Sequence, residues 1–163
     1  AYRVVAIMLG EVDCSYTAWQ RTANASPYAQ IPHAIRGIER LLDWAQSDDR
    51  QRQFILAGAI LPTVKDHQID LQSQELRRTV RASQRQRSEL VLAFNAAVKA
   101  LAIRRQLAYI EITTPTLDPQ RGVISDQFLV QEQIDHHQSQ AMTAGLWVHE
   151  LRPVLASLPR QSR

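Results

Sequence analysis

Two short polar runs carry the side chains that could act on a substrate. Residues 10–13 (Gly-Glu-Val-Asp) follow an apolar run, and residues 135–137 (Asp-His-His) precede a predicted helix near the end of the chain. An Asp close to a His is the arrangement that orients an imidazole as general base for a hydroxyl nucleophile. His137 is therefore the predicted base and Asp135 its orienting carboxylate. The alternative is a polar loop that caps the final helix through Ser139.

Four further residues are candidates for binding a substrate. Gly10, Glu11 and Asp13 could form the rim of a pocket, although Asp13 could equally satisfy backbone donors at a turn. Asn95 falls on a predicted helix, where an Asn more often bridges to a neighbouring loop than binds a ligand. Cys14 is the single cysteine, so it forms no internal disulfide, and a buried free cysteine is commonly inert.

Three apolar runs predict the strands that must position these residues. Residues 2–9, 54–61 and 108–112 are typical of strands, and the continuous run at 2–9 predicts a strand covered on both faces. Helical spacing of apolar residues predicts helices over 31–44, 71–106 and from about 139 onward. The alternation predicts a single α/β domain, a three-layer sandwich with a mostly parallel sheet. We expect the first and third strands to lie side by side, with ligands beyond their carboxyl ends.

Composition excludes several classes of protein. The 163 residues suit one domain, and a net charge of +3 without a basic, aromatic-rich stripe argues against a nucleic-acid partner. No run is apolar enough for a membrane span and no signal peptide is visible, so we expect no membrane partner and a cytoplasmic location. A protein partner or a homo-oligomer remains open. Because the chain starts inside a strand, we expect it to be part of a larger domain.

The order of these motifs resembles the SGNH (GDSL-like) hydrolase superfamily, over its carboxyl-terminal two-thirds. Residues 10–14 are similar to the Gly-x-Asn-Asp block that follows the family's third strand, and Phe94-Asn95 is similar to a Phe-Asn pair in its long helix. Asp135 and His137 correspond to the Asp and His ahead of the last helix. The resemblance implies a flavodoxin-like strand order, no cofactor, and hydrolysis or transfer of an acyl ester, O-acetyl groups on carbohydrates included.

The chain departs from that family in three ways. The Gly-Asp-Ser nucleophile block and the oxyanion glycine are absent, so the resemblance implies a serine outside this chain. The oxyanion Asn falls at Val12, whose side chain cannot donate a hydrogen bond. The usual Asp-x-x-His spacing is shortened to Asp135-x-His137.

Two other functions fit parts of the sequence. The run from 134 to 137 also resembles the metal motif of DHH phosphoesterases, in which Asp135 and His136 would help to hold manganese, although that family has Asp-x-Asp where this chain has Glu11-x-Asp13. Alternatively, the Gln- and Arg-rich segment 72–87 is the solvated face of the long helix and binds a partner, in a catalytically inactive module.

Overall fold

The chain folds around a three-stranded parallel sheet. The computed structural model describes residues 4–21, 26–48, 52–71, 75–131 and 134–158. The strands are β1 (Val4–Met8), β2 (Gln53–Ala57) and β3 (Ala108–Ile110), in the order β1-β2-β3. Both pairings are parallel, as predicted. Because β2 lies between the other two strands, the prediction that the first and third strands are neighbours is wrong.

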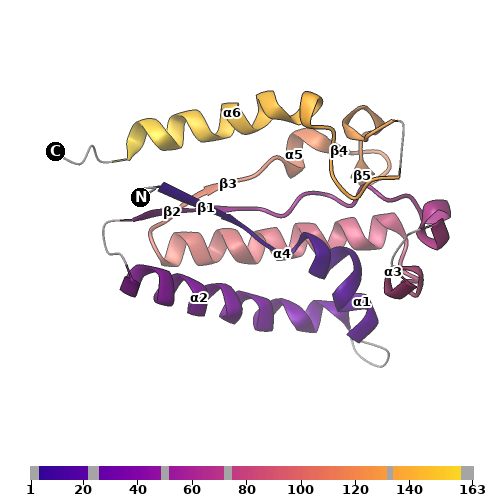
Figure 1. Cartoon of the computed structure of the whole chain (residues 1–163), viewed down its shortest axis with the longest axis horizontal. Helices are drawn as coiled ribbons and strands as arrows, with labels where there is room; N and C mark the ends of the chain where they lie inside the picture. The colour runs from indigo at the N-terminus through magenta and orange to yellow at the C-terminus, as the bar shows by residue number, and fades with distance from the viewer. Residues whose placement is uncertain (1–3, 22–25, 49–51, 72–74, 132–133, 159–163) are drawn as a thin grey trace.

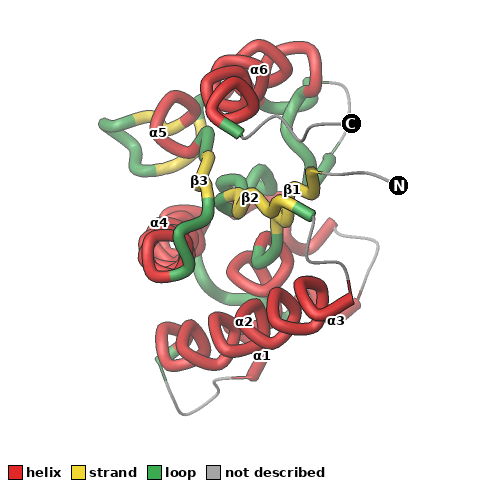
Figure 2. The backbone as a smooth tube through the Cα atoms, turned by 90° about the vertical axis from the view of Figure 1, so that its left-hand side faces the viewer, coloured by secondary structure: helices red, strands yellow, loops and turns green. Residues whose placement is uncertain are grey.

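Helices cover both faces of the sheet and complete a three-layer α/β sandwich, which confirms the predicted fold class (Figures 1 and 2). Helices α2 (Ile31–Asp48) and α4 (Gln84–Arg104) lie on one face, and α6 (Gln140–Ser157) lies on the other. The main core lies between the sheet and α2 and α4. A smaller core joins β2 and β3 to α6. No described helix has the length and apolar character needed to cross a membrane.

The shorter elements connect these layers. They are η1 (Asp13–Thr17), α1 (Ala18–Arg21), η2 (Pro27–Gln30), η3 (Asp66–Leu71), α3 (Glu75–Arg78), α5 (Thr113–Thr116), β4 (Leu117–Asp118), β5 (Val123–Ile124) and η4 (Asp126–Phe128).

Helix α4 begins later than the sequence predicts. Ser83 caps it through a capping box: the Gln86 backbone N–H donates to Ser83 Oγ, and the Ser83 N–H donates to Gln86 Oε1. The predicted single helix over 71–106 is therefore wrong in its first third: η3 ends at Leu71, α3 covers only Glu75–Arg78, and residues 79–83 are not helical. The rest of the predicted helix is confirmed, and the apolar residues that recur along one side of it are all buried. They are Leu90, Phe94, Val98 and Leu101.

The start of α4 is also less solvated than predicted. Gln84 is buried, and its Nε2 donates to the Pro62 carbonyl at 2.8 Å. Arg87 is 0 % exposed and donates to the Val64 carbonyl at 2.7 Å. These bonds anchor the chain after β2 to α4, so the prediction of a wholly solvated polar face is wrong.

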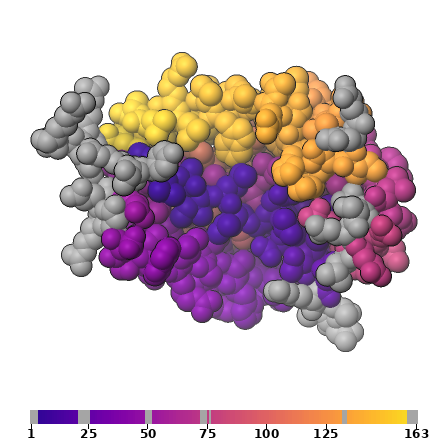
Figure 3. All heavy atoms as spheres, in the orientation of Figure 1, coloured from indigo at the N-terminus to yellow at the C-terminus, as the bar shows by residue number. Residues whose placement is uncertain are grey.

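Among the described strands, β1 lies at an edge of the sheet. Val5 and Ile7 pack against the main core, but Met8 and Leu9 are 46 % and 45 % exposed. Figure 3 shows this part of the chain at the molecular surface. The prediction that both faces of the first strand are covered is therefore wrong, whereas β2, between two strands, is buried along nearly all its length.

Candidate functional site

The turn after β1 depends on Gly10. Its φ of +99° is a backbone conformation that favours glycine, and a Cβ there would clash with the Phe94 ring. The Cys14 backbone N–H donates to the Gly10 carbonyl at 2.8 Å, which starts the helical segment that follows. Gly10 thus sends the chain from the carboxyl end of β1 into η1, with Glu11 at the turn.

Asn95 fixes the chain beyond β2. Its Oδ1 accepts from the Ala59 N–H at 2.8 Å, and its Nδ2 donates to the Ala59 carbonyl at 2.9 Å. The side chain is buried, so this is the bridge to a neighbouring loop that the sequence offered as the alternative to substrate binding. The amide therefore satisfies the two backbone groups of a buried loop residue.

The chain after β2 in turn holds the residues that precede α6. Thr63, six residues beyond the end of β2, donates its hydroxyl to the Asp135 carbonyl at 2.7 Å. This bond joins segments 72 residues apart in sequence. The chain after β2 and residues 135–137 therefore lie side by side.

Asp135 and His137 form the geometry of a general base and its orienting carboxylate. Asp135 Oδ1 lies 2.8 Å from His137 Nδ1 and accepts the His137 backbone N–H at 2.9 Å. These bonds to His137, the backbone one foremost, lower the pKa of Asp135 below 3.8, so the carboxylate is ionised at neutral pH. In the tautomer whose Nδ1–H donates to Asp135, Nε2 is the basic nitrogen. The shortened spacing therefore still permits the pairing.

His136 stacks beside this pair. Its ring centroid lies 3.9 Å from that of His137, with the planes tilted by 41°. Burial, followed by the charges of His137 and Arg77, lowers the pKa of His136 below 6.5. At neutral pH His136 is therefore an uncharged imidazole.

Glu11 brings a second carboxyl group toward the histidines. The pKa of Glu11 is raised above 4.5, mainly by burial. The charges of His137 and Arg77 oppose that rise. Glu11, Asp135, His136 and His137 together are called the carboxyl-end cluster below. Asp13 lines a hollow of about 220 Å³ together with His33.

Arg77 is a site residue that sequence reasoning missed. Its Cζ lies 4.8 Å above the Tyr16 ring, and its charge acts on both Glu11 and His136. No sequence pattern distinguishes Arg77, because it is one of several arginines in a glutamine-rich run. It supplies a positive charge where the cluster otherwise has two carboxyl groups.

The buried nucleophiles near the turn do not belong to the cluster. Burial raises the pKa of the Cys14 thiol to about 12, which keeps it protonated. Ser15 Oγ is buried as well. Among the described residues, no serine, threonine or cysteine side chain is hydrogen-bonded to His137. The base and its carboxylate are present, and the described residues place no hydroxyl nucleophile against them.

The same residues could also hold a metal ion. Asp135, His136 and His137 each offer one ligand atom, and these atoms lie within 4.8 Å of one another. Two imidazole nitrogens and a carboxylate oxygen form a set that suits zinc or manganese. A metal at this place would compete with the hydrogen bond between Asp135 and His137.

Comparison with solved structures shows the fold. No protein-family model and no curated protein sequence matches the chain. A proposed acylhydrolase from Bacteroides fragilis superposes with a TM-score of 0.62 at 10% identity, covering 94% of this chain and 61% of the other. A GDSL-like lipase from Bacteroides thetaiotaomicron gives 0.62 at 12%, covering 94% and 62%. A protein from Streptococcus pneumonia proposed as a platelet activating factor gives 0.62 at 16%, covering 95% and 60%.

These identities are low, so the shared feature is the α/β fold that GDSL-like hydrolases use. The chain spans about 60% of the length of each of these structures.

Proposed function

We propose that residues 1–163 supply the general base and its orienting carboxylate for an SGNH-like hydrolase or acyl-transfer domain. Its substrates are acyl esters, O-acetylated carbohydrates among them. The observation that carries this proposal is the 2.8 Å contact between Asp135 Oδ1 and His137 Nδ1 beyond the sheet's carboxyl ends. The fold shared with a GDSL-like lipase supports it.

In the proposed reaction a serine from outside this sequence attacks the ester carbonyl. As the new C–O bond forms, His137 Nε2 takes the serine proton, and Asp135 stabilises the resulting imidazolium. The tetrahedral intermediate collapses, the ester C–O bond breaks, and the leaving alkoxide takes the proton from His137. Water then repeats these steps on the acyl-enzyme, whereas a second alcohol in place of water gives acyl transfer.

We propose that the nucleophile-bearing segment joins the sheet on the side of β1 that no described strand occupies. A parallel strand added there would end beside Gly10 and Glu11, because parallel strands end at a common edge. It would also reduce the exposure of Met8 and Leu9. The matched structures, which are longer than this chain, have length for such a segment.

The proposal is tested on the full-length gene product with p-nitrophenyl acetate. We expect His137→Ala to lower the hydrolysis rate by about 10³-fold, because the serine loses its base. His33→Ala is the matched control, since His33 lies on α2 and contacts Arg36 instead of the cluster. Full activity of folded His137→Ala would rule out the proposed base. Absence of activity in the folded wild type would favour a binding module.

A metal-dependent phosphoesterase is the second candidate, favoured by the ligand spacing of Asp135, His136 and His137. Its test has two parts. Calorimetry measures the binding of manganese, and an activity assay uses bis-p-nitrophenyl phosphate as the substrate. His136→Ala separates the two functions: it should abolish manganese binding in the phosphoesterase and leave most of the esterase activity in the hydrolase, because only His137 is the base there.

A further inference from the structure

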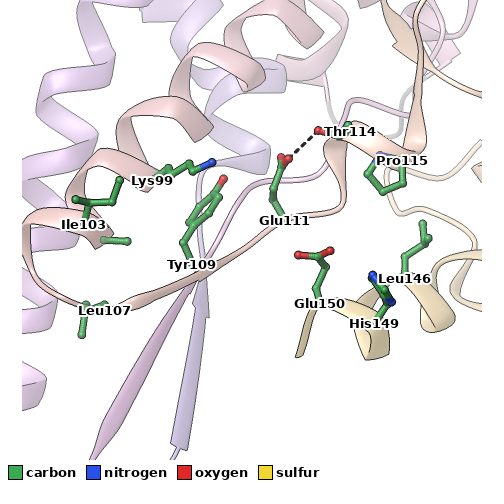
Figure 4. Close-up of a pocket in the computed structure, with 11 residues that line it drawn as sticks. Lys99, Ile103, Leu107, Tyr109, Glu111, Thr114, Pro115, Leu146, His149 and Glu150 are labelled. Carbon is green, nitrogen blue, oxygen red and sulfur yellow. Dashed lines mark hydrogen bonds between the residues drawn. The ribbon is translucent and has the colours of Figure 1, made fainter. Parts of the chain in front are cut away.

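A cleft of about 630 Å³ borders the outer edge of β3, away from β1 (Figure 4). Its walls come from α4, the chain around β3 and α5, and α6. Apolar side chains, Ile103, Leu107 and Leu146 among them, share these walls with charged ones. A volume of this size accommodates several amino-acid residues or a drug-sized molecule.

The backbone of β3 presents a free strand edge to this cleft. The Gly58 N–H donates to the Ile110 carbonyl at 2.9 Å, so Ile110 turns its carbonyl toward β2. Because successive carbonyls of a strand point to opposite sides, that of Tyr109, the residue before Ile110, points outward. No described strand pairs with β3 on that side, and Figure 2 shows β3 as the outermost strand of the sheet.

The charges of the cleft are not compensated within the described structure. Glu111 accepts a hydrogen bond from the Thr114 hydroxyl at 2.9 Å, and no ion pair joins it, Glu150 or Lys99 to an opposite charge in the described part of the chain. Figure 4 shows Glu150 extending from α6 toward Glu111. Lys99, Glu111, Glu150 and the outer edge of β3 together are called the β3 cleft.

Tyr109 adds a neutral donor to the same cleft. Burial, and then the negative charge of Glu111, raises the pKa of the Tyr109 hydroxyl, which therefore stays protonated. Metal binding is not favoured here, because among the described residues the ligand spacing for a metal occurs only at residues 135–137. Two partly buried carboxylates beside a strand edge instead match an organic cation on an extended backbone.

We propose that the β3 cleft binds an extended peptide, which adds as a further strand to β3. A Lys or Arg of the peptide lies between Glu111 and Glu150, and its apolar neighbours pack on Ile103 and Leu146. Main-chain hydrogen bonds to the outer edge of β3 give affinity, and the two carboxylates select the basic side chain. This binding site is independent of the proposed esterase, which uses the carboxyl-end cluster.

The test uses the whole protein and two dye-labelled seven-residue peptides of alternating Val and Thr, one with a central Arg and one with a central Glu. Fluorescence anisotropy should show the Arg peptide binding at least about tenfold more tightly, a difference typical of one added charge contact. Glu111→Gln with Glu150→Gln should remove that difference. Glu89→Gln is the matched control, because Glu89 lies on α4 and pairs with Arg85 outside the cleft.

N-methylated peptides distinguish strand addition from simple charge attraction, and they require no variant of the protein. Methyl groups on alternate backbone nitrogens should weaken binding by about tenfold, because every second N–H of an added strand donates to β3. Methyl groups on the intervening nitrogens should have little effect. Equal affinity of the Arg and Glu peptides, or an equal effect of methylation at every position, would overturn the proposal.

Discussion

The carboxyl-end cluster and the β3 cleft both contain carboxylates, but the two regions differ in how those carboxylates are paired. In the cluster, one carboxylate oxygen of Asp135 contacts both the ring and the backbone of His137. In the cleft, the carboxylates of Glu111 and Glu150 lie near a lysine without pairing to it. The difference shows what each region can do. Groups that orient one another are prepared to move a proton, whereas carboxylates that have no ion pair in the described structure are available to a cationic ligand.

The comparison is most strongly tested by Asp135→Asn in the full-length gene product. We expect hydrolysis of p-nitrophenyl acetate to fall by about 10³-fold, because an amide does not hold the imidazole in the required tautomer or stabilise its charge. Asp43→Asn, on α2 and paired with Arg105, is the matched control and should keep full activity. Equal rates for the two variants would show that the contact between Asp135 and His137 is only structural.

The next largest effect concerns stability. Asn95→Leu should lower the free energy of unfolding by about 3 kcal/mol, because it leaves the N–H and carbonyl of Ala59 buried without partners. Urea denaturation measures this loss. Ala96→Leu, on the exposed side of α4, is the control and should change stability by less than about 0.5 kcal/mol.

This variant also decides between the two roles that the sequence offered for Asn95. If Asn95→Leu keeps the wild-type stability and raises only the KM for an ester, then Asn95 binds substrate and the bridge to Ala59 is secondary. A loss of stability with an unchanged KM in the remaining folded protein would establish the bridging role.

Much of the framework could be predicted from the sequence because its signals are local. The stripe of Leu90, Phe94 and Val98 repeats at helical spacing, and every residue of it is buried. Asp135 and His137 are two residues apart, so their contact needed only a local turn. The parallel direction of the strands followed from the helices between them.

The order of the strands could not be predicted in the same way. The runs that became β1 and β2 are equally apolar, but one is an edge and the other is central. That difference depends on which strands pair, and the pairing joins residues far apart in sequence. The buried Arg87 was missed for the same reason, since its partner, the carbonyl of Val64, lies on a distant segment.

No pattern in the sequence predicts the β3 cleft. Lys99, Glu111 and Glu150 come from three elements, and each is an ordinary charged residue in its own surroundings. Only the placement of α6 across from α4 brings them to one cleft.

A smaller effect is expected from pH. Because the pKa of His136 in the folded protein lies below its ordinary 6.5, the unfolded chain binds more protons in the window just below that value. The contribution of His136 to stability is therefore full above 6.5 and is lost as the pH falls through its folded pKa. Urea denaturation measures the free energy of unfolding at about pH 7.5 and about pH 5.5. The difference between these two values should be smaller for His136→Asn than for the wild type. An unchanged difference would contradict the lowered pKa.

The smallest expected effect is on stability, and it tests the contrast between the carboxyl-end cluster and the β3 cleft. Glu150→Gln should change the free energy of unfolding by less than about 0.5 kcal/mol, because this carboxylate has no ion pair to lose in the described structure. The same variant should weaken the binding of the Arg peptide but not that of the Glu peptide. A clear loss of stability would mean that Glu150 has a partner inside the molecule, and the cleft would then be a structural feature like the cluster's own hydrogen bonds.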